Sequence, residues 1–190
     1  MRALYDSKSK TIDDRGMKAL LGQQARVQSW LDVEAALALA QAEHGMIPAS
    51  AAANIAANCR VENIDLVEME RLLREIGHGF VPMIKVLVKA CDSESGKYVH
   101  YGVTTQNIQQ TAQLYLAKQF NGLLQGFVDD ILRNLADMAR EHHATLMAGR
   151  THGKHALPIT WGYKAAVWID ELLNAQQRMQ EAEKRVFTVM

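Results

Sequence analysis

Three short polar segments of this sequence gather side chains that could move a proton or bind an anion. They are "GHGF" at residues 77–80, "YVHYGVTTQN" at 98–107 and "AGRTHGKHALP" at 148–158. Histidine titrates near neutral pH and can serve as a general acid or base. A glycine that precedes hydroxyl side chains lets a ligand approach the backbone closely. The candidate site residues in these segments are His78, His100, Thr104, Thr105, Thr151 and His152.

His152 is the strongest candidate for a general acid, because it lies between Arg150 and Lys154 in a polar turn. A metal site is the alternative use of the histidines in this region, which are His142, His143, His152 and His155. No helical HxxxH pair and no carboxylate in register accompanies them, so we expect neither a metal nor another cofactor.

The roles of the other candidates have a structural and a functional alternative. Thr104 and Thr105 precede a long helical pattern, where a hydroxyl can either cap the helix or bind an anion at its N-terminus. His78 lies between two glycines, and a lone histidine is more often structural or merely exposed than functional.

The elements that must position these segments are helices. The chain has three prolines and 6% aromatic residues, and it is rich in residues that favour helices. Apolar residues recur at three- and four-residue spacing, which predicts an all-α fold. The predicted helices cover residues 22–43, 48–59, 80–91, 105–142 and 158 to the end, and a further helix begins at Asn63 or Asp65 as its N-cap and ends at Gly77.

The helix predicted from residue 105 is about 55 Å long at 1.5 Å per residue. Two of the polar segments flank it, one before its start and one after its end. The two segments can build one site only if different subunits contribute them, so we expect a homo-oligomer. The start of this helix also divides the chain into an N-terminal helical domain, 1–103, and the first part of a central helical bundle, 104–190.

Charge and hydropathy exclude several classes of function. Lys and Arg together number 21, as do Asp and Glu, which argues against a charge-driven partnership with nucleic acid or a membrane surface. No segment is apolar for long enough to span a membrane. Cys59 and Cys91 lie far apart and predict reduced thiols, so we expect a cytoplasmic protein. The last ten residues become apolar with no stop signal, and we expect the sequence to be part of a longer chain.

Two of the segments carry long motifs. "YVHYGVTTQNIQQTA" resembles the first signature of the fumarase/aspartase superfamily, commonly YVHxGxTSxDxxDTA, and "GRTHGKHALPITWGYKAAVW" resembles the second, usually GRTHGQxAxPTTFGxKxAxW. With "QSWLDVEAALALAQAEHGMIP", the similarity covers nearly the whole chain. The branches that it resembles most are adenylosuccinate lyase and 3-carboxy-cis,cis-muconate cycloisomerase.

The resemblance implies a mostly helical homotetramer in which three subunits build each active site. It implies elimination of fumarate from a succinyl-amine, a small dicarboxylate substrate. His152 matches the general acid, Thr151 a substrate contact and His78 a second histidine that binds the nucleotide part of the substrate. Thr104 and Thr105 match a pair that binds a substrate carboxylate, and His100 matches a nearby site histidine. Lys164 and Trp168 match the pattern as packing residues.

The sequence departs from the superfamily pattern at several positions. Asn107 and Gln110 replace aspartates, and Lys154 adds a cation beside His152 that disfavours the protonated imidazole of a general acid. The third signature, SSxMPxKxNP, holds the serine base and is absent from these 190 residues, so we expect them to be inactive alone. The alternatives are a cycloisomerase and a non-catalytic helical assembly module that has lost the chemistry.

Overall fold

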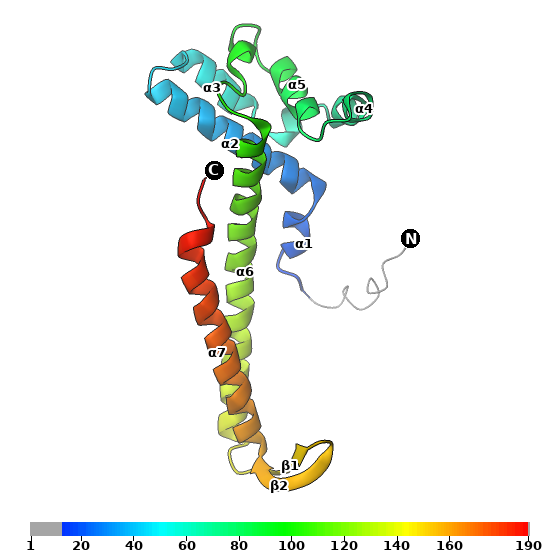
Figure 1. Ribbon diagram of the computed structural model, residues 1–190, viewed down its shortest axis with the longest axis vertical. Coiled ribbons are helices and arrows are strands. Elements are labelled where there is room, and N and C mark those ends of the chain that lie inside the picture. Colours follow the sequence, from blue (N-terminus) through cyan, green and yellow to red (C-terminus); the bar gives the residue numbers. More distant parts are fainter. Residues whose placement is uncertain (1–12, 190) are drawn as a thin grey trace. The chain divides into compact units, whose positions relative to one another are not determined.

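A computed structural model describes residues 13–189 (Figure 1). The predicted all-α fold is confirmed, with one β-hairpin added. The helices are α1 (Met17–Leu20), α2 (Gln23–Glu43), α3 (Ala49–Asn58), α4 (Leu66–Ile76), α5 (Val81–Ala90), α6 (Thr105–Glu141) and α7 (Trp161–Val186), with short 3-10 helices at Val61–Asn63 and Ser95–Tyr98. The hairpin consists of β1 (Leu146–Thr151) and β2 (Lys154–Thr160). Residues 1–12 and residue 190 lie outside the described residues.

The described residues form two compact units. The first extends to Phe120 and includes Thr188 and Val189, and the second is Asn121–Phe187, so α6 contributes to both. This division follows packing contacts along α6, whereas the predicted domain boundary at residues 103 and 104 follows the start of that helix. The boundary therefore stays a prediction.

The core of the first unit forms around α2. Val27, Leu31 and Ala38 recur on one face of α2 and are at most 4% exposed. They belong to one apolar cluster with residues of α3, α4, α5 and the first turns of α6, among them Ile55, Met69, Leu72, Phe80, Met83, Leu87 and Ile108. Helix α2 therefore lies at the centre of the elements that carry the first two polar segments.

Both cysteines are free thiols in this unit, as the sequence predicts. Burial raises the pKa of Cys59 to about 12 and that of Cys91 to about 11. Both side chains are therefore protonated at neutral pH and poor nucleophiles.

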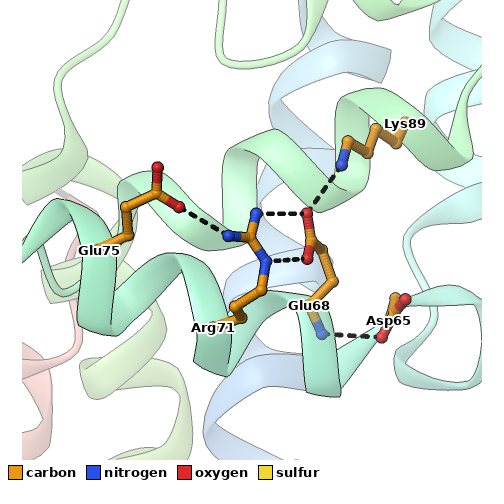
Figure 2. A network of polar contacts seen from close by, with 5 residues as sticks. All are labelled: Asp65, Glu68, Arg71, Glu75 and Lys89. Atoms are coloured by element: carbon orange, nitrogen blue, oxygen red, sulfur yellow. Dashed lines mark hydrogen bonds and ion pairs between the residues drawn. The ribbon is translucent and has the colours of Figure 1, made fainter.

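A polar network braces helices α4 and α5, which flank the segment with His78 (Figure 2). Asp65 caps α4 by accepting a hydrogen bond from the Glu68 amide at 2.9 Å. The Glu68 carboxylate accepts two hydrogen bonds from Arg71, at 2.6 and 3.1 Å, and contacts Lys89 of α5 at 2.9 Å. Arg71 also contacts Glu75 at 2.8 Å. The network joins the two helices at the surface.

This network predicts an acid-sensitive contribution to stability. Hydrogen bonds from Arg71, and then from Lys89, lower the pKa of Glu68 from 4.5 to about 2. A depressed folded-state pKa gives stability that is complete above the unfolded value and is lost as the pH falls through the folded one. We expect Glu68→Gln to lower the free energy of unfolding at neutral pH, and the difference from wild type to shrink between about pH 4.5 and 2.

Denaturant titrations at a series of pH values measure this difference. Glu70→Gln is the matched control, because Glu70 also lies on α4 but its ion pair within the described residues is a single one, with Arg74 at 3.3 Å, and both side chains are exposed. Equal pH dependence of the two variants would show that the Glu68 network does not contribute to stability.

The second unit is an antiparallel pair formed by α7 and the C-terminal part of α6 (Figure 1). Gln176 of α7 donates a hydrogen bond to Asp129 of α6 at 2.7 Å, and Asn121 donates to Glu183. Where the helices meet at the hairpin, the Gly162 amide donates to the His142 carbonyl at 3.0 Å. Thr160 caps α7 by accepting from the Tyr163 amide at 3.1 Å. The hairpin therefore connects the end of α6 to the start of α7, and these two helix ends are joined by a hydrogen bond.

Candidate functional site

His100 is held by a buried carboxylate of helix α2. Its Nδ1 lies 2.6 Å from Oε1 of Glu34, which is 1% exposed, while the His100 side chain is 13% exposed. The His100 ring also packs against Phe80, with ring centroids 5.6 Å apart. His100 has a φ of 60°, in the left-handed region that non-glycine residues seldom occupy. One partner is an acid and the other an aromatic ring, so the imidazole has a defined orientation.

His78 has a structural role that the sequence alternatives did not specify. Its Nδ1 accepts hydrogen bonds from the Phe80 amide at 3.1 Å and the Val81 amide at 3.2 Å, at the start of α5. Nδ1 therefore carries no hydrogen, and in the neutral ring Nε2 is the donor. His78 is exposed, so it caps α5 with one nitrogen and leaves the other for a ligand.

Thr104 and Thr105 lie at the N-terminus of α6, and their hydroxyls make no hydrogen bond to the described residues. The Thr104 amide donates to the Asn107 side chain at 3.1 Å, so Asn107 caps the helix where the superfamily pattern has an aspartate. Within residues 13–189, neither threonine hydroxyl has a hydrogen-bond partner. This arrangement favours the anion-binding alternative over the capping alternative for these two hydroxyls.

The third polar segment forms a β-hairpin, where the sequence indicated only a polar turn. β1 and β2 pair antiparallel from Leu146 opposite Thr160 to Thr151 opposite Lys154, with a bulge at Ala156. His152 and Gly153 form the two-residue turn, with φ values of 50° and 76°, as in a type I′ turn. Thr151, His152 and the whole of β2 before Ile159 are exposed.

Lys164 and Trp168, which the sequence predicts as packing residues, contact each other at the start of α7, and Trp168 is 37% exposed. The Lys164 ammonium lies 5.3 Å from the ring centroid of Trp168 and 5.8 Å from that of Trp161. The two indole rings meet edge to face at 5.7 Å. The cation therefore stacks on the aromatic pair at the start of α7.

The structure brings some of the predicted residues together. His78 and His100 both contact Phe80, which is fully buried, and Thr104 and Thr105 follow His100 in the same connection. Thr151 and His152 belong to the other unit. A separate cavity of about 630 Å³ lies between α1, α2 and the first turns of α6, and no predicted site residue lines it.

Two classes of site have no support in the described residues. In that part of the chain, no group of three or more His, Cys, Asp or Glu side chains is placed to hold a metal ion. None of the helices between residues 13 and 189 is long and apolar enough to cross a membrane.

Sequence reasoning missed Glu34, although the sequence contains a signal for it. Glu34 occupies an apolar position of the helix pattern, three residues after Leu31 and four before Ala38. A carboxylate on the buried face of a helix requires a partner. That requirement could have directed attention to a histidine elsewhere in the chain.

Comparison with known proteins identifies the family. The lyase family matches residues 10–189. The chain is 38% identical to N-acetyl-S-(2-succino)cysteine lyase of Dickeya dadantii over 90% of this chain and 37% of the relative. It is 34% identical to adenylosuccinate lyase of Methanocaldococcus jannaschii over 92% of this chain and 38% of the relative.

A solved structure supports the same assignment. The 3-carboxy-cis,cis-muconate lactonizing enzyme of Pseudomonas putida superposes with a TM-score of 0.91 at 30% identity, covering 100% of this chain and 43% of that one. The chain thus spans less than half the length of the relatives it matches. The family match, the relatives and the two motifs agree, and the chain belongs to the lyases of the fumarase/aspartase superfamily.

Proposed function

We propose that this chain contributes binding and acid groups to a lyase that releases fumarate from a succinyl-substituted amine or thiol. The observation that carries the proposal is the pair of unbonded hydroxyls at the N-terminus of α6, four and five residues after a histidine held by a carboxylate. Helix N-termini and hydroxyls bind carboxylates, and a succinyl group has two of them. The lyases that act on 2-succinocysteine and adenylosuccinate derivatives are relatives of this chain.

The proposed reaction breaks the Cβ–H bond and then the bond from Cα to the leaving nitrogen or sulfur. A base removes the Cβ proton, the electron pair forms the C=C bond of fumarate, and a general acid protonates the leaving atom. His152 supplies that proton, and Thr151 contacts the substrate. Thr104 and Thr105 bind carboxylate, His100 contacts the substrate beside them, and His78 binds the remainder of the substrate through Nε2. The serine base is absent from these residues, so we expect them to be inactive alone.

The site is proposed to form between chains. Thr105 opens α6 and the hairpin follows its last residue, Glu141, and a helix of 37 residues is about 55 Å long. One chain therefore offers its carboxylate-binding threonines and its acid to two different pockets. A homotetramer provides the neighbouring chains.

A cycloisomerase is the second candidate, because the muconate lactonizing enzyme superposes over the whole of this chain. An ultraviolet assay of the full-length protein separates the two candidates. We expect fumarate from adenylosuccinate or N-acetyl-S-(2-succino)cysteine, and no loss of 3-carboxymuconate absorbance. Loss of 3-carboxymuconate absorbance without fumarate release would assign the cycloisomerase. No reaction with any of the three substrates would favour an assembly module.

Thr105→Val tests the binding step in the same assay. Loss of one hydrogen bond to a charged group costs about 1.5–3 kcal/mol, so we expect KM to rise about 10- to 100-fold. Thr105→Ser keeps the hydroxyl and is the matched control, with KM near that of wild type. An unchanged KM in Thr105→Val would exclude a contact between this hydroxyl and the substrate.

A further inference from the structure

Glu34 is a buried acid that no part of the proposed reaction uses. Among residues 13–189 no other carboxylate is buried, and the positions around it on α2 are apolar. Burying a charged side chain among apolar ones costs free energy. Removing one member of a buried ion pair is also strongly destabilising, because the remaining charge is left without a partner. An apolar side chain would pack at this position without that cost, so the function of Glu34 lies in its contact with His100.

Helix α2 fixes the connection that carries His100 at two points on one face. Glu34 contacts Nδ1 of His100 at 2.6 Å, and Gln41, seven residues along the helix, donates to the carbonyl of Tyr101 at 2.7 Å. Gln41 is 6% exposed, so both tethers are buried. His100, a non-glycine residue, is strained in the left-handed region, and contacts of this kind maintain that conformation.

The two tethers differ in what they act on. Gln41 contacts a backbone carbonyl and can influence only where the loop lies. Glu34 contacts a ring nitrogen and can also decide which nitrogen carries the hydrogen, since a carboxylate accepts and cannot donate. The fully buried Phe80 ring packs against the imidazole and limits its rotation.

We propose that Glu34 is the positioning residue of His100. The Glu34 carboxylate accepts the Nδ1 hydrogen, so that Nε2 of the neutral ring carries no hydrogen and meets the substrate as a hydrogen-bond acceptor. The identity of that substrate, a succinyl dicarboxylate, rests on the proposed function. The position of the hydrogen on the His100 ring does not rest on the proposed function, because Glu34 and His100 contact each other in the chain without a ligand.

Nitrogen-15 NMR of the full-length protein, labelled on histidine, tests the state of the ring directly. A His100→Gln sample assigns the signals of His100. We expect hydrogen on Nδ1 of His100, with its proton resonance far downfield because a carboxylate accepts it. Glu34→Gln has the same shape without the charge, and we expect this resonance to move upfield or disappear.

Gln41→Met is the matched control. It removes the other tether from the same face of α2, and we expect the Nδ1 hydrogen of His100 to remain downfield. A bare Nδ1 in wild type would overturn the proposal, since Glu34 would then be the donor. An Nδ1 resonance that does not move in Glu34→Gln would overturn it as well.

The kinetic consequence is measured on the same three proteins. Loss of the group that orients a site histidine reduces activity by about 10- to 100-fold where such outer groups have been removed. We expect that loss in kcat/KM for Glu34→Gln, mainly through KM for the succinyl substrate, and less than about a threefold loss for Gln41→Met. If no succinyl substrate reacts with wild type, the proposed function fails while the NMR result still decides the role of Glu34.

Discussion

Replacing His152 with asparagine is expected to lower kcat for fumarate release by about 10²- to 10⁴-fold and to leave the fold unchanged. His152 and Gly153 form the turn of the β1–β2 hairpin with positive φ values, and Asn-Gly is the pair that favours a type I′ turn most. The substitution therefore removes the imidazole and keeps the turn. Alanine would confuse the two effects, because a β-carbon without a polar group is strained in the left-handed region.

His155→Asn is the matched control for this substitution. His155 is exposed on the same hairpin, opposite Arg150, and has no role in the proposed reaction. We expect kcat within a few-fold of wild type for this variant and thermal midpoints close to wild type for both. Normal turnover in His152→Asn would show that the proton comes from another group and that the resemblance of "GRTHG" misleads for this chain.

The hairpin is also the place where sequence reasoning failed. Its strands contain Gly149 and Pro158, which weaken a strand pattern, and its turn has histidine where hairpins prefer asparagine. The pairing depends on a bulge at Ala156 that no periodicity reveals. By contrast, the helices were predictable, because Asp65 caps α4 and Gly77 follows its last turn with a φ of 70°.

The sequence supplied candidate site residues but not the contacts that position them. The polar segments indicated His78, His100, Thr104 and Thr105, yet nothing local to them indicates that Glu34, 66 residues before His100, contacts its ring. The same limit applies to Phe80, which touches both histidines only after α5 packs on the core. Contacts of this kind depend on tertiary packing, which a pattern within one helix does not encode.

The packing of α6 against α7 gives the largest expected effect on stability. A β-carbon at Gly162 would lie 2.6 Å from the Ala139 carbonyl oxygen and 2.8 Å from the His143 Cα. These are backbone atoms of the end of α6, which cannot turn aside as a flexible side chain can. We expect Gly162→Ala to lower the free energy of unfolding by about 3 kcal/mol, at the upper end of the range for overpacking.

Gly122→Ala is the control, because Gly122 lies inside α6 and, apart from the neighbouring backbone of that helix, no atom of the described chain lies within 4 Å of a β-carbon there. Alanine there is expected to stabilise the helix by up to about 1 kcal/mol, so the two substitutions have opposite signs. Urea denaturation of the full-length protein followed by circular dichroism measures both. Movement of α7 away from α6 would also break the hydrogen bond from the Gly162 amide to His142, at the base of the hairpin that carries His152. Equal stability of Gly162→Ala and wild type would contradict this close packing of the two helices. It would also contradict the inference that the packing holds the hairpin in place.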